Sequence, residues 1–167
     1  IRLTVRELVR RGTVNSGHMC DLSMFDFRDN GRSVRVDNAI IKTGLEDVED
    51  IDISRLSGGQ RQRAVIARAL ATEADFILLD EPLVGIDRES RNSLLRLLDQ
   101  LCHEEGKTIL MVSHDLTAIR KTAHRMIFLE ESIRFDGPTS SFPDLEKLAD
   151  LRGIHDPHED HQMHVEN

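Results

Sequence analysis

The sequence predicts an α/β fold in which a parallel sheet is flanked by helices. Two short apolar runs, 76–79 and 108–112, have the length of strands, and the first reads as a strand buried on both faces. Residues 88–104 lie between them with helical periodicity, which is the order of a β-α-β unit. A further strand is expected at 125–129. Strands separated by helices favour a doubly wound sheet, whose chemistry lies beyond the carboxyl ends of the strands.

Three helices are expected ahead of the first apolar run, at about 4–11, 33–43 and 60–71. Thr4 and Glu7 have the spacing of a capping box, and Ser57 is expected to cap the third helix. Residues 12–32 are loop-like, with a turn expected at 29–31. The first third of the chain is therefore predicted to be a helical region that leads into the sheet.

The remaining elements follow the second apolar run. We expect a helix at 116–123, an edge strand at 132–135, a turn at 136–138 and a last helix at about 141–151. The predicted division is a helical subdomain over 1–58, an α/β part over 59–137, a C-terminal helix over 138–154 and a tail over 155–167.

Composition narrows the class of protein. A formal charge of −8 and the lack of Trp and Tyr disfavour a surface that binds nucleic acid. Cys20 and Cys102 are far apart, so neither a disulfide framework nor a zinc knuckle is indicated, and a reducing compartment fits best. No apolar run approaches the roughly 18 residues that cross a bilayer. Any membrane role is expected to be peripheral.

The start of the third helix carries the first chemical motif. Ser57-Gly58-Gly59-Gln60 would present free backbone N–H groups at a helix N-terminus, where the positive end of the helix dipole favours a phosphate. An ordinary Ser-Gly-Gly cap is the alternative interpretation.

The predicted strand ends carry the second group of candidates. Asp80 and Glu81 end the first strand, His114 follows the second, and Asp87 precedes a helix that it is positioned to cap. Carboxylates fixed at a strand end suit Mg²⁺. Taken singly, each of these residues also fits a solvated strand or helix end.

Four segments together resemble the ABC ATPase family, over about residues 4–137: Leu56-Ser57-Gly58-Gly59-Gln60, Phe76 to Pro82, Val84-Gly85-Ile86-Asp87 and Val112-Ser113-His114-Asp115. They are similar to the family's signature, Walker B, D-loop and switch motifs, although the D-loop more often has a small residue and leucine before its aspartate. The resemblance implies an ATP-hydrolysing enzyme with ATP and Mg²⁺ as cofactors.

The resemblance also implies roles for the candidate residues. Glu81 would polarise the attacking water, Asp80 would hold Mg²⁺ through water, and His114 would contact the γ-phosphate. Asp87 would help to join the two nucleotide sites of a head-to-tail dimer, formed by two copies or by a paired ATPase subunit. The signature residues Ser57, Gly58, Gly59 and Gln60 would complete the partner's nucleotide site.

One motif of the family is missing from the sequence. Nothing here matches the phosphate-binding G-x-x-x-x-G-K-[ST]: the glycines Gly12 and Gly17 have the spacing, but His18 and Met19 follow them. We therefore expect an N-terminally truncated cassette, without its P-loop strand and helix, that does not hydrolyse ATP alone. An inactive fragment is an alternative.

The C-terminal tail gives a clue to the substrate that a transporter of this family would carry. Histidines recur every third residue among acidic ones, at His155, His158, His161 and His164. They are candidates for a divalent-metal site, but Pro157 disfavours a helix there, and a solvated tail with weak metal affinity is the alternative. Similar tails occur in the family's zinc and manganese importers, which favours a metal-ion importer over an iron-siderophore or cobalamin importer.

The implied setting is the cytoplasmic face of the cell membrane, against a permease subunit. Residues 12–32 are a candidate docking segment for that permease, or a small core of their own. A soluble ABC ATPase of DNA repair or translation would share the motifs, but neither heptads nor a duplicated domain is present.

Overall fold

A computed structural model of the chain describes residues 3–13 and 29–143, with side chains from 31 in the second range. The chain divides into two compact units, 1–114 and 115–167, and each is described by itself.

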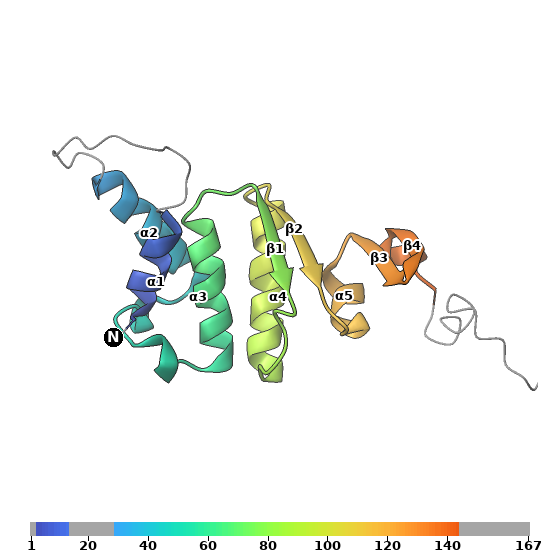
Figure 1. Ribbon diagram of the computed structural model, residues 1–167, viewed down its shortest axis with the longest axis horizontal. Helices are drawn as coiled ribbons and strands as arrows, with labels where there is room; N and C mark the ends of the chain where they lie inside the picture. Colours follow the sequence, from blue (N-terminus) through green and yellow to red (C-terminus); the bar gives the residue numbers. More distant parts are fainter. Residues whose placement is uncertain (1–2, 14–28, 144–167) are drawn as a thin grey trace, which may run out of the picture. The chain divides into compact units, whose positions relative to one another are not determined.

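The first unit begins with a cluster of helices (Figure 1). These are α1 (Val5–Gly12), α2 (Asp29–Thr43) and α3 (Gly58–Leu70), with short 3₁₀ turns at Glu46–Val48 and Ile53–Arg55 between the last two. The predicted capping box is confirmed: the Glu7 amide donates to Thr4 Oγ1 at 3.2 Å, and the Thr4 amide donates to Glu7 Oε2 at 2.8 Å. Val5, Val9 and Ile40 are buried where the helices pack, as an amphipathic pattern predicts.

The turn expected at 29–31 is wrong, because α2 begins at Asp29. A Cβ added to Gly31 would meet nothing within 4 Å, so this first helical turn has no packing constraint at that position. Residues such as Asp, Asn and Gly fit a turn and a helix start equally well, and the local pattern does not separate the two.

A β-α-β unit follows, as predicted. Strand β1 (Phe76–Asp80) and strand β2 (Thr108–Val112) pair in parallel, and α4 (Arg88–His103) connects them. The register places Phe76 beside Thr108 and Asp80 beside Val112, so the two strands end at the same edge of the sheet. Five leucines of α4 are buried: Leu94, Leu95, Leu97, Leu98 and Leu101.

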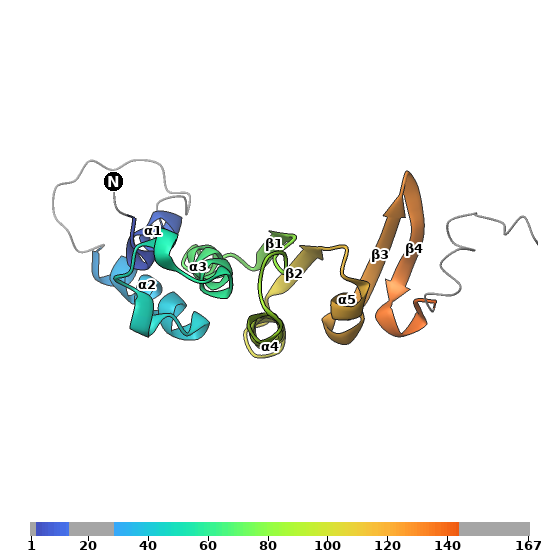
Figure 2. The same ribbon diagram turned by 90° about the horizontal axis from the view of Figure 1, so that it is seen from below.

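The expectation that β1 is buried on both faces is wrong. Ile77 and Leu79 are buried, but Phe76 and Leu78 are more than half exposed. Figure 2 shows why: α4 covers one face of the β1–β2 pair, and no other described element of this unit covers the opposite face. Apolar composition predicts that both faces prefer burial, and it does not reveal whether a covering element is present.

The second unit contains α5 (Leu116–Thr122), β3 (Arg125–Glu130) and β4 (Ser132–Pro138), then a 3₁₀ turn, Thr139–Ser141. Met126 and Phe142 form its small core, with the Phe135 ring edge-on to Phe142 at 5.0 Å. Strands β3 and β4 are antiparallel, so the chain is not parallel throughout.

The turn predicted at 136–138 is also wrong, because β4 continues through it. Arg125 binds Asp136 across the hairpin through two hydrogen bonds, of 2.8 and 2.9 Å, which favours continued pairing. A helix was expected to begin at about residue 141, but a 3₁₀ turn ends there and no helix begins by residue 143. Residues 144–151 lie outside the described residues. Among the residues that the structure describes, no helix is long and apolar enough to cross a membrane.

Candidate functional site

The N-terminus of α3 is closed by reciprocal hydrogen bonds. Ser57 Oγ accepts from the Gln60 amide at 3.2 Å, and Gln60 Oε1 accepts from the Ser57 amide at 3.0 Å. This confirms Ser57 as the N-cap, and it makes Gln60 part of the same capping box. Exposed Ser57 therefore lies at the positive end of the α3 dipole.

The two glycines after Ser57 are required by close packing within the chain. A Cβ on Gly58 would lie 2.8 Å from the carbonyl oxygen of Gly85, and a Cβ on Gly59 would lie 2.6 Å from Ser90 Cβ. Real Cβ atoms do not approach other atoms so closely, so the start of α3 fits against the loop before α4 and the first turn of α4 only without side chains at these two positions. Sequence reasoning offered phosphate binding or an ordinary helix cap as the role of these glycines and missed this contact.

Glu81 lies just beyond β1 in an unusual backbone conformation. Its φ is +46°, in the left-handed region that disfavours residues with a Cβ. Its amide donates to the Val112 carbonyl oxygen at 2.9 Å, which extends the β1–β2 pairing by one residue. A non-glycine residue held in this region is a recognised feature of functional sites.

The strained backbone brings Glu81 to His114, which follows β2. Glu81 Oε1 and His114 Nδ1 lie 2.8 Å apart, although the residues are 33 positions apart in sequence. The histidine side chain is 79% exposed and the glutamate side chain 35% exposed. Glu81 Oε2 is buried with no hydrogen-bond partner among the described residues. A buried carboxylate oxygen of this kind is unusual and calls for a partner at the site.

The two remaining acidic candidates lie on either side of Glu81. Asp80 is exposed at the end of β1, beside Val112 of β2. Asp87 caps α4, where its Oδ1 accepts from the Ser90 amide at 2.9 Å. Hydrogen bonds from the Ser90 side chain and then its amide hold the pKa of Asp87 below its ordinary value. Asp87 is thus a helix cap, as predicted.

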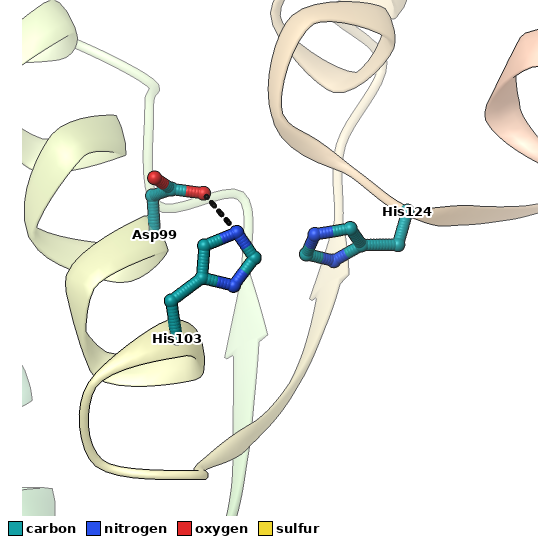
Figure 3. A group of neighbouring side chains, drawn as sticks. All are labelled: Asp99, His103 and His124. Carbon is teal, nitrogen blue, oxygen red and sulfur yellow. Dashed lines mark ion pairs between the residues drawn. The ribbon is translucent and has the colours of Figure 1, made fainter.

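The structure therefore brings together two of the predicted site residues, Glu81 and His114, and packs Gly58 and Gly59 on the segment that follows Glu81. The tail histidines lie outside the described residues. A second acid–imidazole pair, which sequence reasoning missed, joins Asp99 Oδ1 and His103 Nε2 at 3.6 Å on consecutive turns of α4 (Figure 3). The i, i+4 spacing of Asp99 and His103 was the signal that could have found it.

The comparisons with known proteins agree with these motifs. The family model described as ABC transporter matches residues 3–84, a range that contains the α3 cap, Asp80 and Glu81. The chain belongs to the ABC transporter ATPase family.

Curated relatives differ in their cargo. The chain is 40% identical over 114 residues to a manganese transport system ATP-binding protein of Halalkalibacterium halodurans, covering 68% of this chain and 45% of the relative. It is 34% identical over 155 residues to a zinc uptake system ATP-binding protein of Listeria innocua, covering 89% and 58%. A thiamine import ATP-binding protein of Yersinia pestis is 43% identical over 104 residues, covering 62% and 44%. The chain spans about half the length of these relatives.

Solved structures confirm the α/β fold class. An inward-facing putative metal-chelate type ABC transporter matches with a TM-score of 0.78 at 25% identity, covering 92% of this chain and 60% of that chain. A dimeric ATP-binding cassette in a post-hydrolysis state, bound to ADP and phosphate, matches with a TM-score of 0.64 at 29% identity, covering 84% and 58%.

Proposed function

We propose that this chain forms part of the ATP-hydrolysing subunit of an ABC importer for a divalent metal ion such as manganese or zinc. The observation that carries the proposal is the contact between Glu81 and His114 at the carboxyl ends of two paired parallel strands. Chemistry in α/β sheets concentrates at this edge, and a carboxylate next to an imidazole can orient and deprotonate a water molecule.

Glu81 is the proposed general base. Its carboxylate is held by His114 through Oε1 and would accept a hydrogen bond from the attacking water. His114 is exposed enough to reach a γ-phosphate while it holds the glutamate in place. His114 thus has a positioning role, and Glu81 both orients the water and accepts its proton; positioning supplies most of the catalysis of phosphoryl transfer.

The residues present fit a magnesium ion at the edge of the sheet. Asp80 offers an exposed carboxylate, a hard ligand suited to Mg²⁺ directly or through water, and the unpartnered Glu81 Oε2 lies on the next residue. When bound, Mg²⁺ would neutralise charge that develops on the phosphates. Asp80 would hold it, and Glu81 would act on the water.

The capped start of α3 is proposed to act on a neighbouring subunit. Ser57, Gly58, Gly59 and Gln60 would complete the partner's nucleotide site in a head-to-tail dimer, and Asp87 would lie at the junction between the sites. A permease at the cytoplasmic membrane face would complete the transporter. Residues 1–58 are proposed as the helical subdomain and 59–137 as the α/β part, whereas the remainder of the predicted C-terminal helix and the tail lie outside the described residues.

The length of the matches favours a metal cargo. Similarity to the zinc uptake protein extends over 155 residues, whereas similarity to the thiamine import protein extends over 104. The histidines of the tail are further side chains of a metal-binding type. Thiamine is the second candidate, because the thiamine relative has the higher identity over its shorter match.

The cargo is tested by disrupting the gene in its source organism and measuring the uptake of labelled manganese, zinc and thiamine. Loss of manganese or zinc uptake, restored by the intact gene, supports the proposal. Loss of thiamine uptake alone would assign the second candidate, and unchanged uptake of all three would contradict both.

The catalytic assignment is tested by Glu81→Gln in the same organism. We expect uptake and ATP hydrolysis to fall by about a hundredfold or more, because the amide cannot take a proton from water. Glu131→Gln is the matched control, since Glu131 is an exposed glutamate that also has a positive φ, of 51°. The 167 residues alone, which contain no G-x-x-x-x-G-K-[ST], are proposed not to hydrolyse ATP.

A further inference from the structure

Arg63 of α3 joins three helices through one side chain. Its Nη1 donates to the carbonyl oxygen of Thr43, the last residue of α2, at 3.1 Å. Its Nη2 donates to the hydroxyl of Ser93 in α4. Arg63, Thr43 and Ser93 all lie in the first unit, and the Arg63 side chain is half-buried.

The end of α2 is suited to receive the guanidinium. The Thr43 side chain is buried and turned back onto its own helix, where its hydroxyl donates to the Ala39 carbonyl oxygen at 2.8 Å. The Thr43 carbonyl oxygen is one of the groups left unpaired at a helix C-terminus, where the dipole favours a cation. Gly44 follows with a φ of +63°, and a Cβ there would lie 3.1 Å from Arg63 Nη1.

The contact with α4 repeats one made at the start of α3. Gly59 of α3 packs on Ser90 of α4. Arg63 lies four residues after Gly59 in α3, and it binds Ser93, which lies three residues after Ser90 in α4. These spacings place both pairs along facing stripes of the two helices. Two points of attachment fix the angle of α3 against α4, whereas one point would leave it free to pivot.

We propose that Arg63 is a positioning residue that sets the orientation of the α3 N-terminus, and with it Ser57, Gly58 and Gly59, relative to α4 and the end of α2. This role rests on the proposed function, in which those residues act on the partner's nucleotide. Arg63 itself lies about one helical turn beyond Gly59 and acts through α3.

Arg61 offers a matched control on the same helix. Its Nη2 donates to the Leu56 carbonyl oxygen at 3.2 Å, just before the α3 cap. Arg61 has the same size and charge as Arg63 and lies in the same helical turn. Its bond to Leu56 is local, because the two residues are only five positions apart in sequence. Removing it alters the local charge without releasing the bonds of Arg63 to Thr43 and Ser93.

The test uses the transporter complex purified from the source organism with Arg63→Ala, Arg63→Lys, Ser93→Ala or Arg61→Ala. We measure bound nucleotide per chain, nucleotide Kd and kcat for ATP hydrolysis. For Arg63→Ala we expect kcat per bound nucleotide to fall roughly tenfold or more, while the nucleotide Kd stays unchanged. The reason is that a small displacement of groups that contact the reacting nucleotide lowers kcat. Arg63→Lys, which keeps the charge and one bond, is expected to recover part of the rate. Ser93→Ala is expected to lose a smaller part, and Arg61→Ala to match the unsubstituted complex.

Three outcomes would overturn this role. They are an unchanged kcat in Arg63→Ala, a loss fully explained by less bound nucleotide, and an equal loss in Arg61→Ala. If Arg63→Ala does not assemble, Arg63→Lys and Ser93→Ala decide between the same outcomes. An unsubstituted complex without ATPase activity would instead refute the proposed function, and the role of Arg63 would fall with it.

Discussion

The N-terminus of α3 and the carboxyl ends of β1 and β2 carry the two groups of proposed site residues, and the chain holds them differently. At α3, Gly59 is buried against Ser90 and the capping residues satisfy each other. At the strand ends, His114 is largely exposed, and its contact with Glu81 depends on a strained backbone.

This difference shows which geometry the chain determines by itself. The orientation of the α3 cap follows from close packing against α4, which resists small displacements. The strand-end pair lies beside a sheet with one exposed apolar face, so fewer neighbours restrain it. Substitutions at the packed regions should therefore change stability, and those at the open ones should change mainly activity.

The largest expected effect contrasts the two faces of the β1–β2 sheet. Leu94→Ala, in the helix that covers one face, should lower the free energy of unfolding by about 3 kcal/mol, because it leaves a cavity in a fully buried site. Leu78→Ala, on the exposed face, should lower it by less than about 1 kcal/mol. Urea denaturation of the purified chain measures both. Equal losses would show that the exposed face is packed in solution.

An intermediate effect is expected from glycine substitutions. Gly59→Ala should destabilise the chain by about 2 kcal/mol, because its Cβ would overlap Ser90 and force α3 and α4 apart. Gly31→Ala is the control: it also lies in a first helical turn, has open space around it, and should stabilise by about 0.5 kcal/mol. The same denaturation experiment compares them, and tolerance of Gly59→Ala would mean that the α3 packing is looser than described.

The smallest expected effect is on the pH dependence of stability, through Asp87. Its pKa is lowered in the folded state by hydrogen bonds from Ser90, so folding favours the carboxylate. That contribution is present above the ordinary pKa near 3.8 and is lost as the pH falls through the lowered value. Asp87→Asn should flatten the loss of stability between about pH 5 and pH 3. An identical pH profile for the two proteins would show that this bond does not contribute.

Features set by residues close in sequence were predictable. Thr4, Ser57 and Asp87 were each expected to cap a helix, and each does, because an N-cap bonds to an amide three residues away. Strand β2 has the predicted bounds, 108–112, because a short apolar run between polar residues has few alternatives.

Features set by distant residues were not predictable from local pattern. The residues Asp136-Gly137-Pro138 favour a turn, but they continue strand β4, where Asp136 forms an ion pair with Arg125 across the hairpin. The exposure of Leu78 depends on which elements cover the sheet, and the contact of Glu81 with His114 depends on strand pairing and on the φ of residue 81. The motif order nevertheless selected both residues as candidates, because it depends on residue type and sequence order and not on conformation.

At residue 81, the side chain that suits the proposed chemistry is not the one that gives the most stable backbone. Glycine would adopt a φ of +46° without strain, whereas glutamate is penalised there by roughly 1 kcal/mol. Selection for thermal stability alone would therefore replace Glu81 with glycine and remove its contact with His114 Nδ1. Under the role proposed for Glu81, a sequence optimised for stability alone and a sequence that hydrolyses nucleotide would differ first at this position.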